Sequence, residues 1–491
     1  MDAETFGVPP PRFRIVKFRR LLRGCVLSWL SSAMLALGAE RPNVVVILAD
    51  DLGWADVGYQ GADLIETPHI DALAREGLRF SQAYAMPVCS PARAALLTGL
   101  NPARIPLTIW SEGSLQGPQN RKLLQAESSH DLPLERVTLA EKLRARGYLT
   151  CLIGKWHLGD AAHFPETQGF DVNIGGTQWG APHSFFWPYR GSGRFGNEFR
   201  FVPDLPFGKE GEYLTDRLTQ EALKVIDQAG ETPFFLYLAH HAPHTPMEAK
   251  AEDVAYFEQK LRPGMHHQNA VYAAMIKSLD DSVGTVRAAL RERGLEQRTI
   301  LLFTSDNGGY IGIDRKAGQD VPVTSNHPLR SGKGSCYEGG LRVPMCLLWP
   351  GVTQPGTHCD APVSLMDWMP TLTAALDLEP DPAVDGVDWK PLLSDPQAPL
   401  ERDALFFHYP HYYETTTPVS AVRAGRWKLL HYFEDDQVEL YDLTADPGES
   451  RDLATDEPHR AAELRARLDL WRQQVGARAP QPNPNAKPSR K

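Results

Sequence analysis

The chain has 491 residues, 42% of them hydrophobic and 23% charged, which is an ordinary globular composition with enough material for a large core. Its formal net charge of −10 argues against general nucleic-acid binding, because that function needs a basic face. An anionic substrate is still compatible with this charge, since a local positive pocket can lie in an acidic protein.

The N-terminal residues 1–39 have the pattern of an export signal. A basic stretch containing Arg12 and Lys17 precedes an apolar run over residues 25–37, and small residues up to Ala39 follow it, as at a cleavage site. The run is too short to span a bilayer comfortably, so we expect no stable membrane insertion. This pattern predicts an exported protein, periplasmic or secreted. An uncleaved anchor or an amphipathic extension is the alternative.

Five short apolar runs are typical of the buried strands of a parallel sheet, and helical patterns lie between them. The runs cover residues 44–49, 148–153, 234–239, 299–304 and 343–349. A helix is predicted from Pro68 to the residue before Gly77, and another over residues 139–146. This alternation predicts an α/β fold with a large, mainly parallel sheet flanked by helices.

Polar side chains follow four of these strands at the point where each strand ends. They are Asp50 and Asp51, then Lys155 and His157, then His240, His241 and His244, and finally Asp306 and Asn307. Ligands of open α/β sheets bind beyond the carboxyl ends of the strands. The four groups are therefore expected to converge on one site.

Asp50, Asp51, Asp306 and Asn307 all offer hard oxygen ligands. Adjacent carboxylates do not stay ionised together without a cation, so a site for Ca²⁺ or Mg²⁺ is predicted. Zinc fits less well because it favours nitrogen and sulfur ligands. For Asp50 and Asp51 taken alone, a turn or a helix cap is the simpler interpretation.

Five other side chains would supply positive charge and proton donors around an anionic group. They are Arg93, Lys155, His157, His244 and Lys333. His240 and His241 are weaker candidates, because neighbours in an extended segment face opposite ways. A histidine metal site at residues 240, 241 and 244 is a competing interpretation, which ranks below the catalytic one.

Residues 89–99, Cys-Ser-Pro-Ala-Arg-Ala-Ala-Leu-Leu-Thr-Gly, resemble the signature of the sulfatase family, within the alkaline-phosphatase-like superfamily. Further stretches resemble family motifs in family order: residues 50–53, 67–74, 154–159, 305–309, 333–334, 338–344, 422–429 and 439–449. The resemblance covers most of the chain after the predicted signal. One departure is Ala92, where many members have Ser.

The resemblance implies a formylglycine residue, made from Cys89 before folding by a formylglycine-generating enzyme, as the nucleophile. Asp50, Asp51, Asp306, Asn307 and the modified Cys89 would hold a divalent cation, Ca²⁺ rather than Mg²⁺. Arg93 would stabilise the hydrated aldehyde. Lys155, His157, His244 and Lys333 would bind sulfate oxygens or protonate the leaving group. The implied activity is that of a sulfuric ester hydrolase.

A sulfated carbohydrate is the expected substrate, on the breadth of the family and the predicted export. Residues 105–133 and 175–207 lack clear periodicity and are candidates for the pocket mouth. Aromatic candidates for a sugar contact are Trp179, Phe185, Phe186, Trp187 and Tyr189, although burial in the core is the expected role for most of these five. A second candidate edge of the substrate site comprises Tyr409, His411, Tyr412 and Tyr413. Two alternatives stay open: a phosphate or phosphonate ester hydrolase of the same superfamily, and a non-catalytic binder of sulfated glycans.

The domain organisation expected from the sequence has four parts. After the signal at 1–39 come a catalytic α/β domain at 40–390, a small domain at 391–478 and a disordered tail at 479–491. The small domain is predicted to hold antiparallel strands and a helix that begins at Pro458. Four cysteines besides Cys25 and Cys89 leave disulfides and isolated buried thiols equally open.

Overall fold

The computed structural model describes residues 41–115, 120–194, 196–315 and 320–486, and the predicted signal at 1–39 lies outside them. The chain divides into two units, Met1–Arg41 and Pro42–Lys491, and every described helix and strand belongs to the second unit. Across the described ranges, no helix has both the length and the apolar character that crossing a membrane requires.

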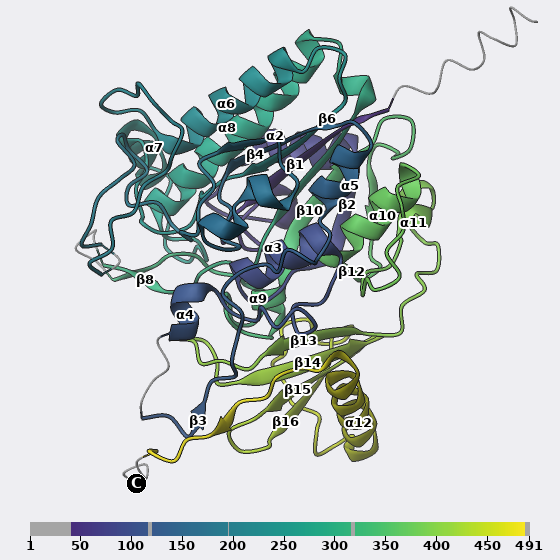
Figure 1. Ribbon diagram of the computed structural model, residues 1–491. Coiled ribbons are helices and arrows are strands. Elements are labelled where there is room, and N and C mark those ends of the chain that lie inside the picture. Colours follow the sequence, from purple (N-terminus) through teal and green to yellow (C-terminus); the bar gives the residue numbers. More distant parts are fainter. Residues whose placement is uncertain (1–40, 116–119, 195, 316–319, 487–491) are drawn as a thin grey trace, which may run out of the picture. The chain divides into compact units, whose positions relative to one another are not determined.

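The centre of the fold is a large sheet in the order β11-β2-β10-β7-β1-β6-β4-β5 (Figure 1). The strand β1 (Asn43–Ala49) lies between β7 (Thr299–Ser305) and β6 (Phe234–Ala239) and runs parallel to both. Next to β6 come β4 (Leu149–Gly154) and β5 (Val172–Ile174), again parallel. The predicted α/β class with a mainly parallel sheet is therefore confirmed.

On the other side of β7, one strand of the large sheet runs in the direction opposite to the expected one. The run predicted at 343–349 forms β10 (Arg342–Leu348), which pairs antiparallel with β7 and with β2 (Leu78–Tyr84). The chain enters β10 from the short helix α9 (Glu338–Leu341) at the edge where β7 ends, so the strand must run back across the sheet. Two short strands, β11 (Thr357–Cys359) and β12 (Val363–Ser364), pair with β2.

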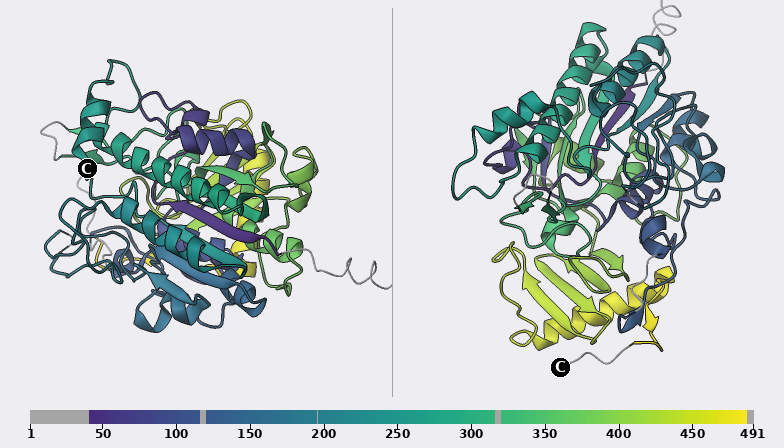
Figure 2. Two further views of the ribbon diagram at one scale, coloured as in Figure 1. Left: turned by 90° about the horizontal axis from the view of Figure 1, so that it is seen from above. Right: turned by 90° about the vertical axis from the view of Figure 1, so that its left-hand side faces the viewer.

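Helices cover both faces of the sheet, as Figure 2 shows. One face packs Val45 and Ile47 against α2 (Pro68–Glu76), α6 (Leu214–Gln228) and α8 (Ala270–Glu292). The opposite face packs Val44 and Val46 against α3 (Cys89–Thr98), α5 (Leu139–Ala145) and α10 (Trp368–Ala375). Alternate residues of β1 thus serve two separate cores, which explains its continuous apolar sequence.

Shorter elements connect these layers. They are η1 (Gly58–Gln60), α4 (Ser111–Leu115), β3 (Leu123–Leu124), η2 (Ala161–His163), η3 (Pro165–Gln168), α7 (Ala251–Glu258), η4 (Glu296–Arg298), β8 (Ile313–Asp314), β9 (Val321–Pro322), η5 (Leu365–Asp367) and α11 (Lys390–Ser394).

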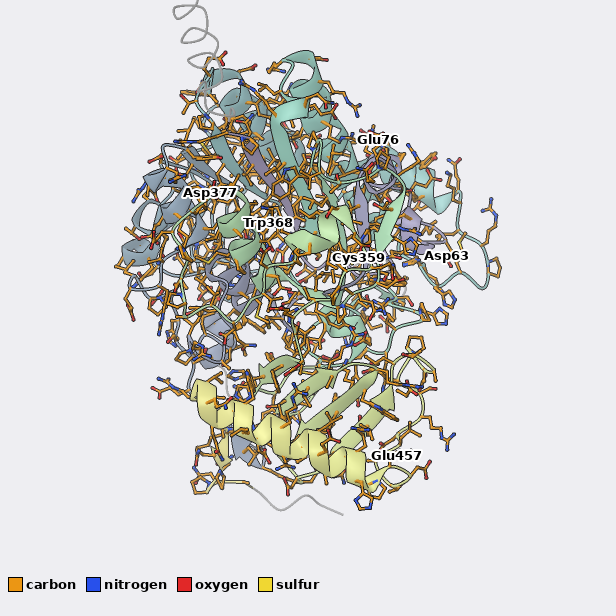
Figure 3. All side chains as sticks on the ribbon, turned by 90° about the vertical axis from the view of Figure 1, so that its right-hand side faces the viewer. Asp63, Glu76, Cys359, Trp368, Asp377 and Glu457 are labelled. Carbon is orange, nitrogen blue, oxygen red and sulfur yellow. The ribbon has the colours of Figure 1, made fainter. Side chains whose placement is uncertain are left out.

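A small antiparallel sheet near the C-terminus is also confirmed, in the order β13 (Leu405–Tyr409), β14 (Val419–Ala424), β15 (Trp427–Tyr432) and β16 (Val438–Asp442). The helix α12 (Pro458–Val475) lies across it (Figure 3). Leu464 and Leu468 face the sheet, and Trp471 stacks on Phe406 with ring centroids 4.8 Å apart.

The expectation of a disordered C-terminal tail is wrong for the residues that the structure describes. Residues 479–486, expected to belong to a disordered tail, include the strand β17 (Gln481–Pro482), which pairs with β3. The interstrand hydrogen bonds give this polar, proline-rich segment an order that its composition does not indicate.

Of the two interpretations left open for the cysteines, disulfides or isolated thiols, the structure shows isolated thiols. Cys151, Cys336, Cys346 and Cys359 are free and buried in the described chain.

Candidate active site

Asp50 and Asp51 lie in the turn directly after β1, at the carboxyl edge of the sheet. Asp51 has a left-handed backbone with φ 67°, and hydrogen bonds hold it there. Its N–H donates to Oδ1 of Asp306 over 3.2 Å, and the hydroxyl of Tyr272 donates to its carbonyl over 3.0 Å. The turns after β1 and β7 are thereby joined, so all four predicted oxygen ligands gather at one place.

These carboxylates are buried and paired with cations. Nζ of Lys155 lies 2.8 and 2.7 Å from the two carboxylate oxygens of Asp50, and Nζ of Lys333 lies 2.8 Å from Oδ2 of Asp51. Burial raises the pKa of Asp50, and Lys155 offsets this only in part because Asp306 and Asp51 raise it further. Burial also acts against ionisation of Asp51, but Lys333 and His244 outweigh it and lower its pKa.

Asn307 supplies an observation that favours a cation here. Its Nδ2 donates to Oδ1 of Asp51 over 2.8 Å, while its Oδ1 is buried and has no hydrogen-bond partner among the described residues. A buried amide oxygen without a partner is costly, and an oxygen-binding cation would satisfy it. The donor set of Asp50, Asp51, Asp306 and Asn307 therefore fits a hard divalent cation such as Ca²⁺.

Cys89 begins α3 and is 2% exposed at the inner end of a cavity. Burial would raise the pKa of its thiol, but Lys155, His157 and Lys333 outweigh this and lower it to about 6. The thiol marks the position that a formylglycine side chain would take. One turn further on, Arg93 lies on the same face of the helix.

Arg93 joins three parts of the site from behind the cavity. Its Nε donates to Oδ2 of Asp306 over 2.9 Å, and its Nη1 donates to the carbonyl of Lys155 over 2.9 Å. It is 1% exposed, so these charge-assisted bonds act in a region shielded from solvent. Arg93 thus fixes the helix that carries Cys89 against the strand ends that carry the acidic residues.

His157 and His244 face the cavity from two different loops. Nδ1 of His244 donates to the carbonyl of Thr245 over 2.7 Å, which leaves Nε2, 3.5 Å from Oδ2 of Asp51, directed into the site. Burial lowers the pKa of His244 to about 3. The ring of His157 packs on Gly180, where an added Cβ would lie 2.3 Å from its Cε1, so a glycine is required there.

The cavity has a volume of about 310 Å³ and joins residues that are distant in sequence. Of the predicted residues, Asp51, Cys89, His157, His244 and Lys333 line it, whereas Asp50, Arg93, Lys155, Asp306 and Asn307 lie in the buried layer behind. Both segments expected at the pocket mouth contribute to the wall, with Trp110 and Glu112 from 105–133 and Gly180, Ala181 and Arg200 from 175–207.

The aromatic candidates divide between wall and core. Tyr413 lines the cavity together with Trp110, and their rings meet edge to face with centroids 5.8 Å apart. Phe185, Tyr189 and Tyr409 are fully buried and belong to the core. Glu112, Arg200, Tyr310 and Thr245 were not predicted, because none of them belongs to a periodic pattern or a recognisable motif. Glu112 lies on the short helix α4, and the other three lie in loops.

The competing histidine metal site does not form. His244 groups with Asp50 and Asp51, and among the residues described no metal-type cluster contains His240 or His241. Nε2 of His240 lies 2.9 Å from Oγ of Ser282 on α8, and burial lowers the pKa of His240 to about 3. His240 therefore belongs to the packing beneath the site.

Comparison with known proteins gives the family. The sulfatase family model matches residues 42–378, well over half of the chain, and a model of the N-sulphoglucosamine sulphohydrolase C-terminal region matches residues 332–474. The chain therefore belongs to the sulfatase family, a class of enzymes that hydrolyse sulfate esters on an alkaline-phosphatase-like fold.

Individual relatives agree with this assignment. The chain is 34% identical to arylsulfatase A of Homo sapiens over 478 residues, covering 86% of each protein. It is 34% identical to N-acetylgalactosamine-6-sulfatase of Mus musculus, over 80% of this chain and 73% of that one. The crystal structure of Ps i-CgsB in complex with k-i-k-neocarrahexaose is similar with a TM-score of 0.71 and 32% identity, over 88% of this chain and 92% of that chain.

Proposed function

We propose that this protein is an exported hydrolase of carbohydrate sulfate monoesters, with a formylglycine residue made from Cys89 and a bound Ca²⁺ ion. The observation that carries the proposal is the meeting of Cys89, Lys333, His157 and His244 around one cavity, directly in front of a buried acidic cluster. The sugar part of the proposal is supported by relatives that act on N-acetylgalactosamine 6-sulfate or are complexed with neocarrahexaose.

Two groups would complete the site chemically. The cation, held by Asp50, Asp51, Asp306 and Asn307 with the modified Cys89, would polarise the sulfate group and lower the charge that its transition state must bear. The hydrated aldehyde of formylglycine would supply the attacking hydroxyl and a second hydroxyl through which sulfate is later released. Conversion of Cys89 makes a formylglycine-generating enzyme a partner during maturation.

The chain's own residues divide the remaining work. Lys333 reaches the cavity and binds a sulfate oxygen, while Lys155 and Arg93 add positive charge from the buried layer. Nε2 of His244 faces the cavity without a proton before substrate binds, because Nδ1 donates to the carbonyl of Thr245 and burial keeps the ring neutral by lowering its pKa. The negative charge of a bound sulfate group favours protonation of Nε2 from solvent, and Nε2 then gives this proton to the departing alcohol oxygen. His157, held against Gly180 beside Cys89, holds the proton of the nucleophilic hydroxyl group.

The test begins with the mass of the peptide that contains Cys89, in protein from its own host. We expect an aldehyde in place of the thiol, and hydrolysis of sulfate esters well above that of matched phosphonate esters. Cys89→Ala should fold normally, with an unchanged melting temperature, and lose turnover by a factor of about 10⁴ or more. Unchanged activity in this variant would overturn the mechanism, and an unmodified thiol throughout would favour a glycan-binding protein.

A further inference from the structure

The outer wall of the catalytic cavity carries an ion pair that the proposed chemistry does not use. Nη2 of Arg200 lies 3.2 Å from Oε1 of Glu112, and both side chains line the cavity. The guanidinium carbon of Arg200 also lies over the ring of Trp179, 5.0 Å from its centroid, in a cation–π contact. A negative group in a cavity that receives an anion is unfavourable for binding that anion, so its presence needs an explanation.

Glu112 is close to the reacting groups as well. Its Oε2 lies 3.6 Å from Nε2 of His157, and its side chain is 20% exposed on the cavity side. Burial would raise the pKa of Glu112, but His157 and Arg200 outweigh it and lower the pKa to about 2. The carboxylate is therefore ionised over the whole working range of pH.

The charges of Glu112 and Arg200, which both line this wall, balance each other, and a second carboxylate lies behind them. Nη2 of Arg200 is also 3.1 Å from Oε2 of Glu198, so two carboxylates share one guanidinium. Lys333 attracts an anion to its part of the cavity, whereas the carboxylate of Glu112 repels a second anionic group placed beside it. A substrate that fits both charges carries its sulfate group toward Lys333 and neutral hydrogen-bonding groups toward Glu112.

We propose that Glu112, positioned by Arg200, selects sugar rings that carry a single sulfate group beside a free hydroxyl group, and disfavours rings with a second sulfate group at that position. The carboxylate accepts a hydrogen bond from the sugar hydroxyl, and the guanidinium offers donors beside it. Trp110 and Tyr413 form the apolar part of the same wall, which suits the apolar face of a pyranose ring.

This inference rests on the proposed function, and its test separates the two. The full-length protein with converted Cys89 is assayed on N-acetylgalactosamine 6-sulfate, on its 4,6-disulfate and on 4-nitrophenyl sulfate, which has no neighbouring hydroxyl group. We expect kcat/KM to favour the monosulfated sugar over the disulfated one by about 10-fold, the scale of one uncompensated like-charge contact. Glu112→Gln should reduce this preference to below about 3-fold.

Two controls support the interpretation. Glu198→Gln removes a carboxylate that pairs with the same guanidinium but does not line the cavity, and it should leave the preference within a factor of about 2. Glu112→Asp keeps the charge and should retain the preference for the monosulfated sugar. Melting temperatures establish that each variant is folded, and should Glu112→Gln not fold, the wild-type ratio and Glu112→Asp carry the test.

Three outcomes would overturn the inference. One is a folded Glu112→Gln variant with an unchanged preference, and another is a wild-type protein that favours the disulfated sugar. The third is hydrolysis of 4-nitrophenyl sulfate with neither sugar cleaved, which removes the inference and leaves sulfatase activity intact. If converted protein cleaves none of the three compounds, the proposed function itself fails and the inference fails with it.

Discussion

At the scale of single residues, the acidic cluster holds a buried polar atom that its own cations leave without a partner. Asp50, Asp51 and Asp306 are buried together, and Arg93, Lys155 and Lys333 pair with them at 4 Å or less. The unpartnered Oδ1 of Asn307 points to a further positive group. A cation bound there would link the turns after β1 and β7, so its binding should be visible in stability as well as in activity.

We expect Ca²⁺ to raise the melting temperature of the wild-type protein, because a ligand that binds the folded state alone stabilises it, by about 3 kcal/mol at a hundred times its dissociation constant. Asp306→Asn removes one charged ligand and should abolish the shift. Differential scanning fluorimetry with and without Ca²⁺ measures both. Asp281→Asn, in an acidic group on α8, is the matched control and should keep the full shift. An equal shift in Asp306→Asn would place the cation elsewhere.

The residues behind this prediction are also those that sequence reasoning finds most readily. Asp50, Asp51, Asp306 and Asn307 each follow a buried apolar strand, and the carboxyl ends of parallel strands share one edge, so their meeting could be expected. Glu112 and Arg200 could not be found this way. Glu112 lies on the short helix α4 and Arg200 lies in a loop, and their positions depend on tertiary contacts such as the bridge between Gly191 and Arg200. The catalytic roles assigned to the predicted residues stay predictions.

At the scale of elements, a buried histidine ties the turn after β1 to the segment before α8. Nδ1 of His267 lies 2.7 Å from Oδ1 of Asp63, and Nε2 lies 3.1 Å from Oδ1 of Asp56. Asp56 also accepts hydrogen bonds from the N–H of Gly53 over 2.6 Å and from the hydroxyl of Tyr272 over 2.7 Å. The hydroxyl of Tyr272 also donates to the carbonyl of Asp51, so this network fixes the turn that carries Asp50 and Asp51.

This network should make stability depend on pH. Burial would lower the pKa of His267, but Asp56 and Asp63 outweigh it and raise the pKa. A raised pKa in the folded state gives stability that is complete below the unfolded value of about 6.5 and is lost as pH rises through the folded value. His267→Gln should therefore lower the melting temperature by about 2 °C more at pH 6 than at pH 9. An equal decrease at both values would show that His267 contributes packing and no charge.

Elements differ in how far their arrangement follows from sequence. The parallel strands β1, β4, β6 and β7 are apolar throughout and bounded by turn residues, so local pattern suffices to predict them. The direction of β10 is not encoded in its own residues, since an apolar run has no polarity of its own. It depends on where α9 delivers the chain, which is a tertiary property.

At the scale of the unit Pro42–Lys491, a buried charge triad joins the large sheet's edge to the small C-terminal sheet. Nζ of Lys428 on β15 lies 2.9 Å from Oε1 of Glu338 on α9 and 2.8 Å from Oε1 of Glu449, and all three side chains are at most 1% exposed. The hydroxyl of Tyr84 on β2 donates to Oε2 of Glu338 over 2.7 Å. The two sheets are thus held together by ionic contacts shielded from water.

Breaking this triad should be costly, because it leaves carboxylates buried without a counter-charge. We expect Lys428→Met to lower the free energy of unfolding by about 3–5 kcal/mol, as measured by urea denaturation. Lys224→Met, at a lysine that is 57% exposed and paired with Glu221, should change it by less than about 1 kcal/mol. Adding Glu338→Gln and Glu449→Gln to Lys428→Met should recover part of the loss. A loss unaffected by these additions would mean that shape, and not charge, holds the sheets together.

The pairing of β17 with β3 has a consequence for trimming or fusing the protein at its C-terminal end. Asn483 donates from its backbone to the carbonyl of Lys122 over 2.9 Å, and from Nδ2 to the carbonyl of Arg121 over 2.7 Å. The segment it fastens leads back to α4, which carries Glu112. A protein that is cleaved or ends before residue 481 would lose these bonds to the segment after α4 while keeping the hydrophobic cores. We therefore expect a change in substrate preference to appear before any unfolding does.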